Sequence, residues 1–286
     1  MLTDRLRAAA DTLTSRQRRI ANYVTAHTDD TAFMSITKLA AKTGSSQATI
    51  VRFCRALGYG GYSDFVHELQ QTVQAKLSAS ARFRLSQQGE QSEGKASGNR
   101  LRGLLAAEVD NLNRLADAID PVSFARVVDL LTRSTNVVVI GCHGSAPLAH
   151  ALGISLCRIR RRVAIVDRHG VRASSAFGEL SGRSCVVVMA FPRYPTETLE
   201  LAQAARATQA RIVGITNTAA SPLISLTDTH LLVPVGMPSF ADAYASPMAL
   251  VTALCVSAGD ALGQTTKENL SLFDEYASQV GLFVSP

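Results

Sequence analysis

Apolar residues recur at helical spacing throughout residues 1–77, and the stretch 46–57 shows the pattern most clearly. Four of its apolar residues fall at i, i+3, i+4 and i+7: Ile50, Phe53, Cys54 and Leu57. This spacing predicts an amphipathic helix with one buried face. Ser45 and Ser46 at its start supply an N-cap, and Gly58 after it supplies a C-terminal stop.

The opposite face of this predicted helix is polar. Its hydrogen-bonding residues are Ser46, Gln47, Thr49, Arg52 and Arg55. A shorter amphipathic helix ends just upstream at Thr43, and Gly44 provides a tight turn. Two short helices, a turn with glycine and a polar second helix form a helix-turn-helix pattern. A helical hairpin in an ordinary all-α domain stays open as the alternative.

From residue 137 onward the pattern changes to short apolar runs that alternate with helical stretches. The runs cover 137–140, 163–166, 185–189, 212–215 and 231–234. Helical spacing lies between and after them, in 145–157, 196–208, 245–262 and 270–283. β-rich runs separated by helices predict a parallel sheet flanked by helices, which is an α/β fold.

Between these regions, residues 78–100 are rich in Ser, Gln, Gly, Glu and Lys. Such a composition predicts a flexible linker. The expected domains are an all-α helix-turn-helix domain over 1–77, the linker over 78–100, and an α/β domain with flanking helices over 101–286.

Charge separates the two regions further. Residues 1–102 hold 15 Lys and Arg against 8 Asp and Glu, whereas residues 103–286 hold 14 against 15. The whole net charge of +6 therefore lies in the first third of the chain. A basic excess confined to the helix-turn-helix segment favours binding to DNA phosphates. We expect Gln47, Thr49 and Arg52 to face base edges, and Ser46 and Arg55 to lie nearer the phosphates.

The composition of the chain excludes several classes of protein. The five cysteines are scattered without a Cys-x-x-Cys pair, so we expect neither a metal site nor a disulfide framework. The polar N-terminus carries no signal peptide, and we find no uninterrupted apolar run long enough to cross a bilayer. We therefore expect a soluble, cytoplasmic protein without a membrane partner.

Two predicted strand-to-helix loops are candidates for ligand binding, because ligands bind beyond the carboxyl ends of parallel strands. The first loop runs from Gly141 through His143, Gly144 and Ser145 into a helix, whose N-terminus favours anions. A tight turn with a serine cap explains this loop equally well. Its Gly-x-x-Gly-Ser spacing lacks the dinucleotide fingerprint, so no cofactor is predicted.

The second loop, 191–198, holds three further candidates: Arg193, Tyr194 and Thr196. Arg193 is suited to pair with a phosphate, Tyr194 to stack on a ligand or to form a wall of the pocket, and Thr196 to bind a ligand or to cap the helix. Possible acids and bases nearby are His143, His169, Glu179 and Glu197. No convincing carboxylate–histidine pair emerges, so we assign no catalytic residue and expect no enzyme.

One stretch of the chain resembles the helix-turn-helix of RpiR-type bacterial regulators. It reads Ser46-Gln47-Ala48-Thr49-Ile50-Val51-Arg52-Phe53-Cys54-Arg55-Ala56-Leu57-Gly58 and is followed by Gly61-Tyr62 and Phe65. Residues 120–263 resemble the SIS (sugar isomerase) domain, a flavodoxin-like or Rossmann-like fold that binds phosphorylated sugars. The resemblance implies a homodimeric or homotetrameric transcription factor that binds operator DNA. Its effector would be a phosphorylated sugar or sugar acid.

Within that resemblance, Ser145 falls on the serine of the first SIS loop. The third-strand loop departs from the usual Ser-x-Ser-Gly-x-Thr run, since this chain has Ala190-Phe191-Pro192-Arg193-Tyr194-Pro195. We hypothesise that Arg193 replaces the lost hydroxyl contacts with charge. The competing function is a sugar-phosphate isomerase with an accessory helical domain.

Overall fold

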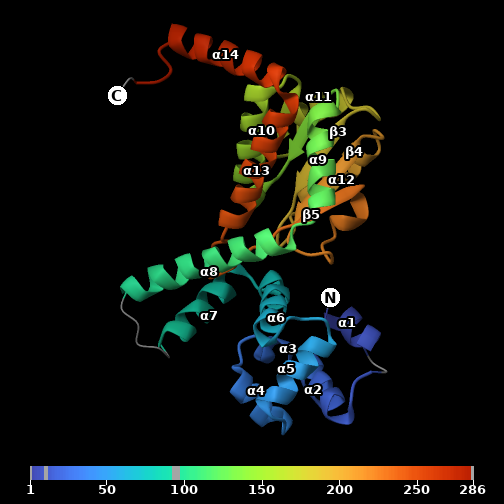
Figure 1. Cartoon of the computed structure of the whole chain (residues 1–286), viewed down its shortest axis with the longest axis vertical. Coiled ribbons are helices and arrows are strands. Elements are labelled where there is room, and N and C mark those ends of the chain that lie inside the picture. The colour runs from blue at the N-terminus through green and yellow to red at the C-terminus, as the bar shows by residue number, and fades with distance from the viewer. Residues whose placement is uncertain (1, 10–11, 92–96, 285–286) are drawn as a thin grey trace. The chain divides into compact units, whose positions relative to one another are not determined.

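The computed structural model describes residues 2–9, 12–91 and 97–284, and the chain divides into two compact units. The first unit is Met1–Glu93 together with Ser239–Ala241. The second is Gly94–Pro238 together with Asp242–Pro286. An all-α region followed by an α/β region confirms the predicted fold class (Figure 1).

The first unit is built from seven helices among its described residues: α1 (Leu2–Ala9), α2 (Ser15–Ala26), α3 (Thr28–Thr31), α4 (Ile36–Thr43), α5 (Gln47–Ala56), α6 (Tyr62–Lys76) and α7 (Ala79–Gln91). Apolar residues of α1, α2, α4, α5 and α6 meet in one core around the buried rings of Phe53 and Phe65. The α2 helix begins with a capping box between Thr14 and Gln17, which fixes its first turn.

The α7 helix corrects the expected linker over 78–100. Most of that segment is helical, since α7 covers Ala79–Gln91 and α8 starts at Ser97; residues 92–96 lie outside the described part. Although the segment is polar, Arg82 is buried to 5% exposure, and the ring of Phe83 contacts that of Phe240. Contacts with a segment about 150 residues away stabilise this helix, and composition alone does not reveal them.

The second unit is a five-stranded parallel sheet of order β2-β1-β3-β4-β5. Its strands are β1 (Val137–Ile140), β2 (Val163–Val166), β3 (Cys185–Met189), β4 (Arg211–Thr216) and β5 (Thr229–Leu232). Because strand side chains alternate, Val137 and Val139 belong to one apolar cluster, whereas Val138 and Ile140 belong to another. Both faces of the sheet are therefore covered.

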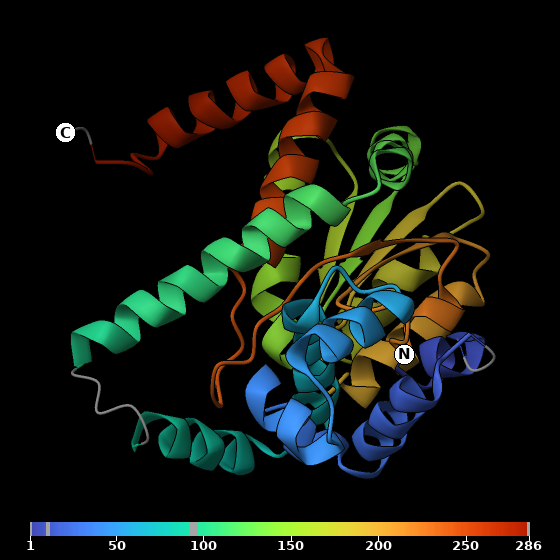
Figure 2. The same ribbon diagram turned by 60° about the horizontal axis from the view of Figure 1, so that its bottom comes forward.

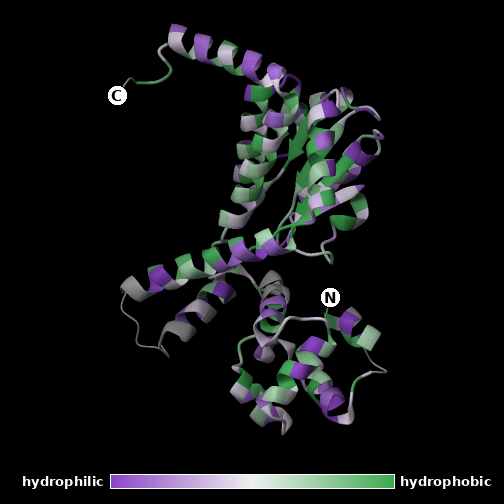
Figure 3. Ribbon diagram, in the orientation of Figure 1, coloured by the Kyte–Doolittle hydropathy of each residue, from purple (hydrophilic) through white to green (hydrophobic). Residues whose placement is uncertain are grey.

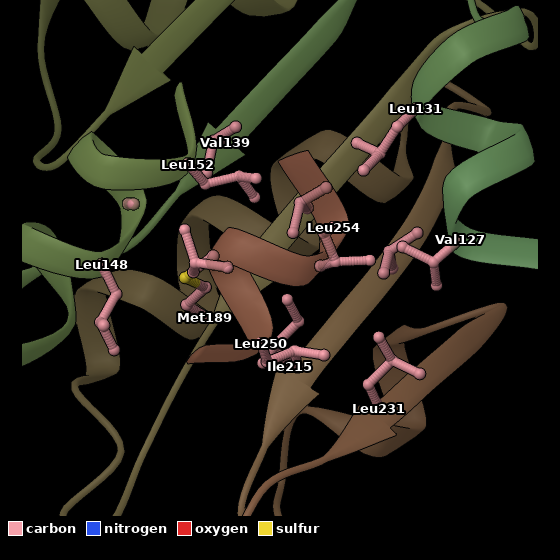
Figure 4. Packing of buried hydrophobic residues seen from close by; sticks show 14 of the residues in the cluster. Val127, Leu131, Val139, Leu148, Leu152, Met189, Ile215, Leu231, Leu250 and Leu254 are labelled. Atoms are coloured by element: carbon pink, nitrogen blue, oxygen red, sulfur yellow. The ribbon is translucent and has the colours of Figure 1, made fainter. Parts of the chain in front are cut away.

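Helices form the outer layers (Figure 1). One face packs against α9 (Pro121–Arg133), α10 (Ala146–Ile159) and α13 (Ala245–Leu262), with their leucines converging on Val139, Met189 and Ile215 (Figure 4). The other face packs against α11 (Val171–Gly178) and α12 (Thr196–Arg206). The predicted α/β architecture and the five strands are confirmed.

The α13 helix is long and apolar enough to cross a membrane by length and composition. Its side chains Leu250, Leu254 and Ala258 lie instead in the core against the sheet. This packing is typical of the central helix of an α/β domain, which is apolar on most sides.

Two helices of the second unit extend beyond the sheet: α8 (Ser97–Ala118) and α14 (Gln264–Gln279) (Figures 1 and 2). The α14 helix starts six residues before the expected 270, because Gly263 at φ 54° ends α13 there. Both helices carry green apolar turns along their projecting parts (Figure 3). Their exposed apolar residues are Leu101, Leu104, Leu105, Val109, Leu272 and Tyr276.

Arg160, the first of three consecutive arginines, caps a helix of the second unit. Its guanidinium donates to the carbonyl oxygens of Leu131 and of Ser134, the latter at 2.7 Å. Those carbonyls end α9, so Arg160, which follows α10, caps the C-terminus of a different helix. Burial lowers the pKa of Arg160 from its ordinary value.

Candidate nucleic-acid interface and effector site

The local sequence fixes the turn between α4 and α5. Gly44 adopts a left-handed backbone at φ 60°, which glycine tolerates best, and the Ser45 N–H donates to the Ala40 carbonyl at 2.9 Å. Ser46 then caps α5, because its Oγ accepts the Thr49 N–H at 3.2 Å. The predicted helix-turn-helix geometry is therefore present.

The apolar face of α5 is buried as predicted. Ile50, Phe53 and Cys54 are fully buried, and Leu57 is 4% exposed. The Phe53 ring meets Phe65 edge-on at 5.9 Å between centroids. Burial raises the pKa of the Cys54 thiol to about 12, so this cysteine is a small apolar core residue and not a reactive group.

The polar face of α5 differs from the prediction at one residue. Ser46, Gln47, Arg52 and Arg55 are exposed, but Thr49 is only 8% exposed. The Thr49 hydroxyl lies 2.9 Å from Ser46 Oγ and completes the cap, so it does not present itself to a base edge. Exposed Ala48 was missed: its methyl lies on the open face, and alanine is suited to contact a thymine methyl.

Two contacts brace the exposed side chains. Gln47 Nε2 donates to Thr37 Oγ1 on α4 at 3.0 Å, and an Arg52 guanidinium nitrogen lies 3.4 Å from Thr49 Oγ1. The first turn of α5 is thus held by both its cap and the preceding helix. Three arginines on α2 are also exposed, as expected for phosphate contacts: Arg16, Arg18 and Arg19.

Arg5 of α1 holds the other end of α5. Its guanidinium donates to the carbonyl oxygens of Leu57 at 3.0 Å and Gly58 at 3.3 Å, and stacks over the Tyr59 ring at 4.5 Å from its centroid. Cations at a helix C-terminus complement its dipole. Composition did not single out this residue, because its partners lie more than fifty positions away.

We expect Arg5→Ala to destabilise the first unit by about 1–2 kcal/mol, since it removes charge-assisted hydrogen bonds and a cation–π contact. Thermal unfolding followed by circular dichroism measures this loss. Arg5→Lys is expected to lose less, because the ammonium keeps the charge and the ring contact. Equal melting temperatures for Arg5→Ala and the parent would show that the capping contacts are not stabilising.

The second candidate site lies at the carboxyl edge of the sheet. β1 and β3 are neighbours whose connections leave in opposite directions, and such a switch point forms a ligand crevice in open α/β sheets. The two loops singled out by sequence both follow these strands. A Cβ on Gly141 would lie 2.8 Å from the Ser145 carbonyl oxygen and 2.9 Å from Ala149 Cβ, so glycine is needed there.

The first loop turns sharply into α10. His143 has φ 51° and is exposed, and Gly144 beside it is exposed too. Ser145 precedes α10 as expected, but it is only 2% exposed and makes no side-chain cap. At the N-terminus of α10, the groups that a ligand can reach therefore belong to His143 and Gly144, which precede Ser145.

The second loop holds Arg193 in a strained conformation. Arg193 has φ 72° and is exposed, although a non-glycine residue is uncommon there. The half-buried Tyr194 donates its hydroxyl to Asn217 Oδ1 at 2.8 Å, which fixes its side chain against the loop after β4. Thr196 is exposed and is not the N-cap of α12, which is Pro195. The buried Thr198 connects this loop to the loop after β1, because its hydroxyl accepts the Cys142 N–H at 3.4 Å.

A third loop follows β2, and sequence analysis had placed only its His169 near the site. Residues 165–172 line a cavity of about 410 Å³ there. The hydrogen bonds from Arg168 and His150 lower the pKa of Asp167 to about 2, so this carboxylate stays ionised even in mild acid. The loop thus adds fixed charges beside the two predicted loops.

Glu197 of α12 ties these loops together. Its carboxylate accepts the His169 N–H at 2.7 Å and lies 3.3 Å from His143 Nε2, while His169 Nε2 lies 3.0 Å from Glu200 Oε2. The expectation that the site lacks a carboxylate–histidine pair is therefore wrong. The partners come from different loops, so spacing could not reveal them. Glu179 lies elsewhere, where its carbonyl accepts from Asn136 at the start of β1.

The loop after β5 also reaches the site. A Cβ on Gly144 would lie 3.0 Å from the Tyr244 hydroxyl oxygen, and the Tyr244 ring packs 5.8 Å from that of Phe191. The Tyr244 hydroxyl donates to Asp242 Oδ2 at 3.2 Å. Sequence analysis missed both residues, because no glycine-rich or phosphate-binding pattern surrounds them.

Comparison with known proteins assigns a domain family to each of the two regions. Residues 1–76 match the helix-turn-helix domain of the rpiR family, and residues 130–257 match the SIS domain. The transcriptional regulator HexR of Escherichia coli is 23% identical, with 96% of this chain and 91% of HexR aligned. HexR of Pseudomonas aeruginosa is 24% identical, with 94% and 90% aligned.

Solved structures include the Vibrio vulnificus NanR protein complexed with ManNAc-6P, at 25% identity and a TM-score of 0.59 over the full length of both chains. The sugar isomerase domain of an RpiR transcription factor from Sphaerobacter thermophilus shares the fold, at 18% identity and a TM-score of 0.58 over 60% of this chain and 97% of that one. Full-length similarity to regulators disfavours the isomerase alternative. The chain belongs to the RpiR-type transcriptional regulators, with a helix-turn-helix domain for DNA and a SIS domain.

Proposed function

We propose that this regulator binds a palindromic operator through α5 and that a phosphorylated sugar or sugar acid, bound at the carboxyl edge of the SIS sheet, controls that binding. The observation that carries the proposal is the convergence of three strand loops on one edge of a parallel sheet. Cationic or imidazole groups from each loop are exposed there: His143, Arg168, His169 and Arg193.

For DNA, the proposed base-reading residues are Gln47, Ala48 and Arg52, with Ser46 and Arg55 nearer the phosphates. Their exposure on one helix, beside the exposed arginines of α2, supports this assignment. Thr49 acts through the cap that fixes the first turn of α5.

For the effector, the proposed contacts are the backbone of Gly141–Ser145, His143 and Arg193, with Tyr194 as a wall. The N-terminus of α10 favours a phosphate, and a guanidinium on a rigid loop pairs with phosphate or carboxylate oxygens. NanR, which was solved with ManNAc-6P, supports a phosphorylated sugar as the class of effector.

A palindromic operator requires at least two copies of α5, so we also place a homodimer or homotetramer in the cytoplasm. The exposed apolar side chains on α8 and α14 support self-association, because such faces are costly in water. Sedimentation of the purified chain measures this state; a monomer at micromolar concentration would contradict it.

The experiment that tests the proposal begins with selection of duplexes from a random DNA library by the full chain. We expect enrichment of an inverted repeat with half-sites about one helical turn apart or a multiple of it. A thermal-shift screen over phosphorylated sugars and sugar acids then identifies the effector, because a ligand that binds only the folded chain stabilises it. Failure to enrich any duplex would contradict the DNA role, and unphosphorylated sugars shifting the melting temperature equally would contradict the phosphate role.

A further inference from the structure

Thr37 and Gln47 connect the two helices of the helix-turn-helix across the turn. Thr37 is the second residue of α4 and Gln47 is the first residue of α5, and both are exposed. Gln47 Nε2 donates to Thr37 Oγ1 at 3.0 Å. Leu39 of α4 and Ile50 of α5 are fully buried in the same core, which holds the two backbones in place. The Thr37–Gln47 bond therefore joins two rigid elements.

The bond to Thr37 decides which hydrogen-bonding groups Gln47 keeps for a ligand. A glutamine amide carries two N–H groups and one oxygen. Since one N–H is given to Thr37, the other N–H and Oε1 are left for a partner outside the protein. A neighbouring donor and acceptor match adenine, which presents an acceptor at N7 and a donor at N6 in the major groove. Guanine presents two acceptors there, so this edge of the amide fits guanine poorly.

The hydroxyl of Thr37 opposes a reversal of the Gln47 amide. A reversed amide would place Oε1 toward Thr37 and would need the Thr37 hydroxyl proton as its donor. Thr37 lies in the first turn of α4 beside the exposed Lys38, and the first helix of this motif crosses the DNA backbone. Threonine hydroxyls and helix N-termini bind DNA phosphates. A phosphate that accepts the Thr37 proton thus keeps Gln47 in the orientation that suits adenine.

We infer that Thr37 is a positioning residue, which orients Gln47 so that α5 reads an adenine at one position of each operator half-site. The inference rests on the proposed function, because that proposal makes α5 the base-reading helix. A bond that only stabilised the turn would affect binding to every duplex alike. Base preference at a single position therefore separates an orienting role from a structural one.

Gln47→Ala identifies the position that Gln47 reads. We expect the parent chain to prefer adenine over guanine at this position by about 5- to 150-fold, and we expect Gln47→Ala to lose that preference and no other. Fluorescence-anisotropy titrations with the selected duplex and its single-base variants, at one salt concentration, measure the preference.

Thr37→Val then removes the hydroxyl and keeps the shape of the side chain. Because the amide is free to reverse in this variant, we expect the adenine preference at the Gln47 position to fall about fivefold or more, with the preferences at other positions unchanged. Thr37→Ser keeps the hydroxyl and is expected to retain the adenine preference. In the Gln47→Ala background, Thr37→Val is expected to change affinity uniformly across the duplexes, because no amide is left to orient.

Thr25→Val is the matched control, since Thr25 is an exposed threonine of α2 whose hydroxyl donates within its own helix, to the Ala21 carbonyl at 2.9 Å. This variant is expected to keep every base preference. The inference would be overturned by a preference for a base other than adenine at the Gln47 position, by the lack of any position that responds to Gln47→Ala, or by a parental adenine preference in Thr37→Val. Each of these results leaves operator binding itself intact. Failure of the parent chain to enrich any duplex would instead refute the proposed function, and the inference with it.

Discussion

Arg52→Ala is expected to weaken binding to the selected duplex by about 1–3 kcal/mol, which is about 5- to 150-fold. Arg52 is exposed on α5 and held beside the capped first turn, so its guanidinium is placed to pair with a base edge. A fluorescence-anisotropy titration at fixed salt measures the loss. Since Arg52 is exposed, the melting temperature is expected to stay unchanged.

Arg18→Ala is the matched control, because it removes an exposed arginine of α2 from the same basic unit. A phosphate contact carries no sequence information, so this variant should weaken selected and random duplexes alike and reduce the salt slope by about one. If Arg52→Ala instead weakened both duplexes equally, Arg52 would be a phosphate contact and its assignment to a base edge would be wrong.

Arg193→Ala is expected to lower effector affinity by about 1.5–3 kcal/mol, the ordinary value of hydrogen bonds to a charged group. Arg193 is an exposed residue of the loop after β3, with a left-handed backbone φ of 72°. Isothermal calorimetry with the compound of largest thermal shift measures the change. Arg193→Lys should recover only part of the affinity, because an ammonium lacks the planar fork.

Arg133→Ala serves as the control for charge, since Arg133 is an exposed arginine of the second unit that pairs with Asp129 on α9. It is expected to bind the effector with parental affinity. Unchanged affinity of Arg193→Ala would refute the replacement of hydroxyl contacts by charge in this loop. Operator binding without the effector should be parental in both variants.

The parts of the structure that follow local periodicity could be predicted from sequence. The buried face of α5, with Ile50 and Phe53, and the five strand runs depend on neighbours a few positions apart. Thr49 could not be assigned this way, because its spacing suits both the polar face and the cap. The rotamer that brings its hydroxyl to Ser46 decides between them.

The parts that depend on distant residues could not be predicted. Glu197 meets His143 across two loops, Tyr244 approaches Gly144 from about one hundred positions away, and Phe240 stabilises α7 from farther still. In each case parallel-sheet topology or tertiary packing brings together side chains that no motif joins. Sequence therefore indicated the loops after the first and third strands, indicated only His169 of the loop after the second, and left out the loop after the last.

The most direct test of effector control is a titration of the selected duplex by the full chain, with and without the best compound from the thermal-shift screen at saturation. We predict that the compound changes duplex affinity by about 5- to 150-fold, and that the duplex changes the affinity for the compound by the same factor. Identical duplex affinity with and without a saturating compound would contradict the account.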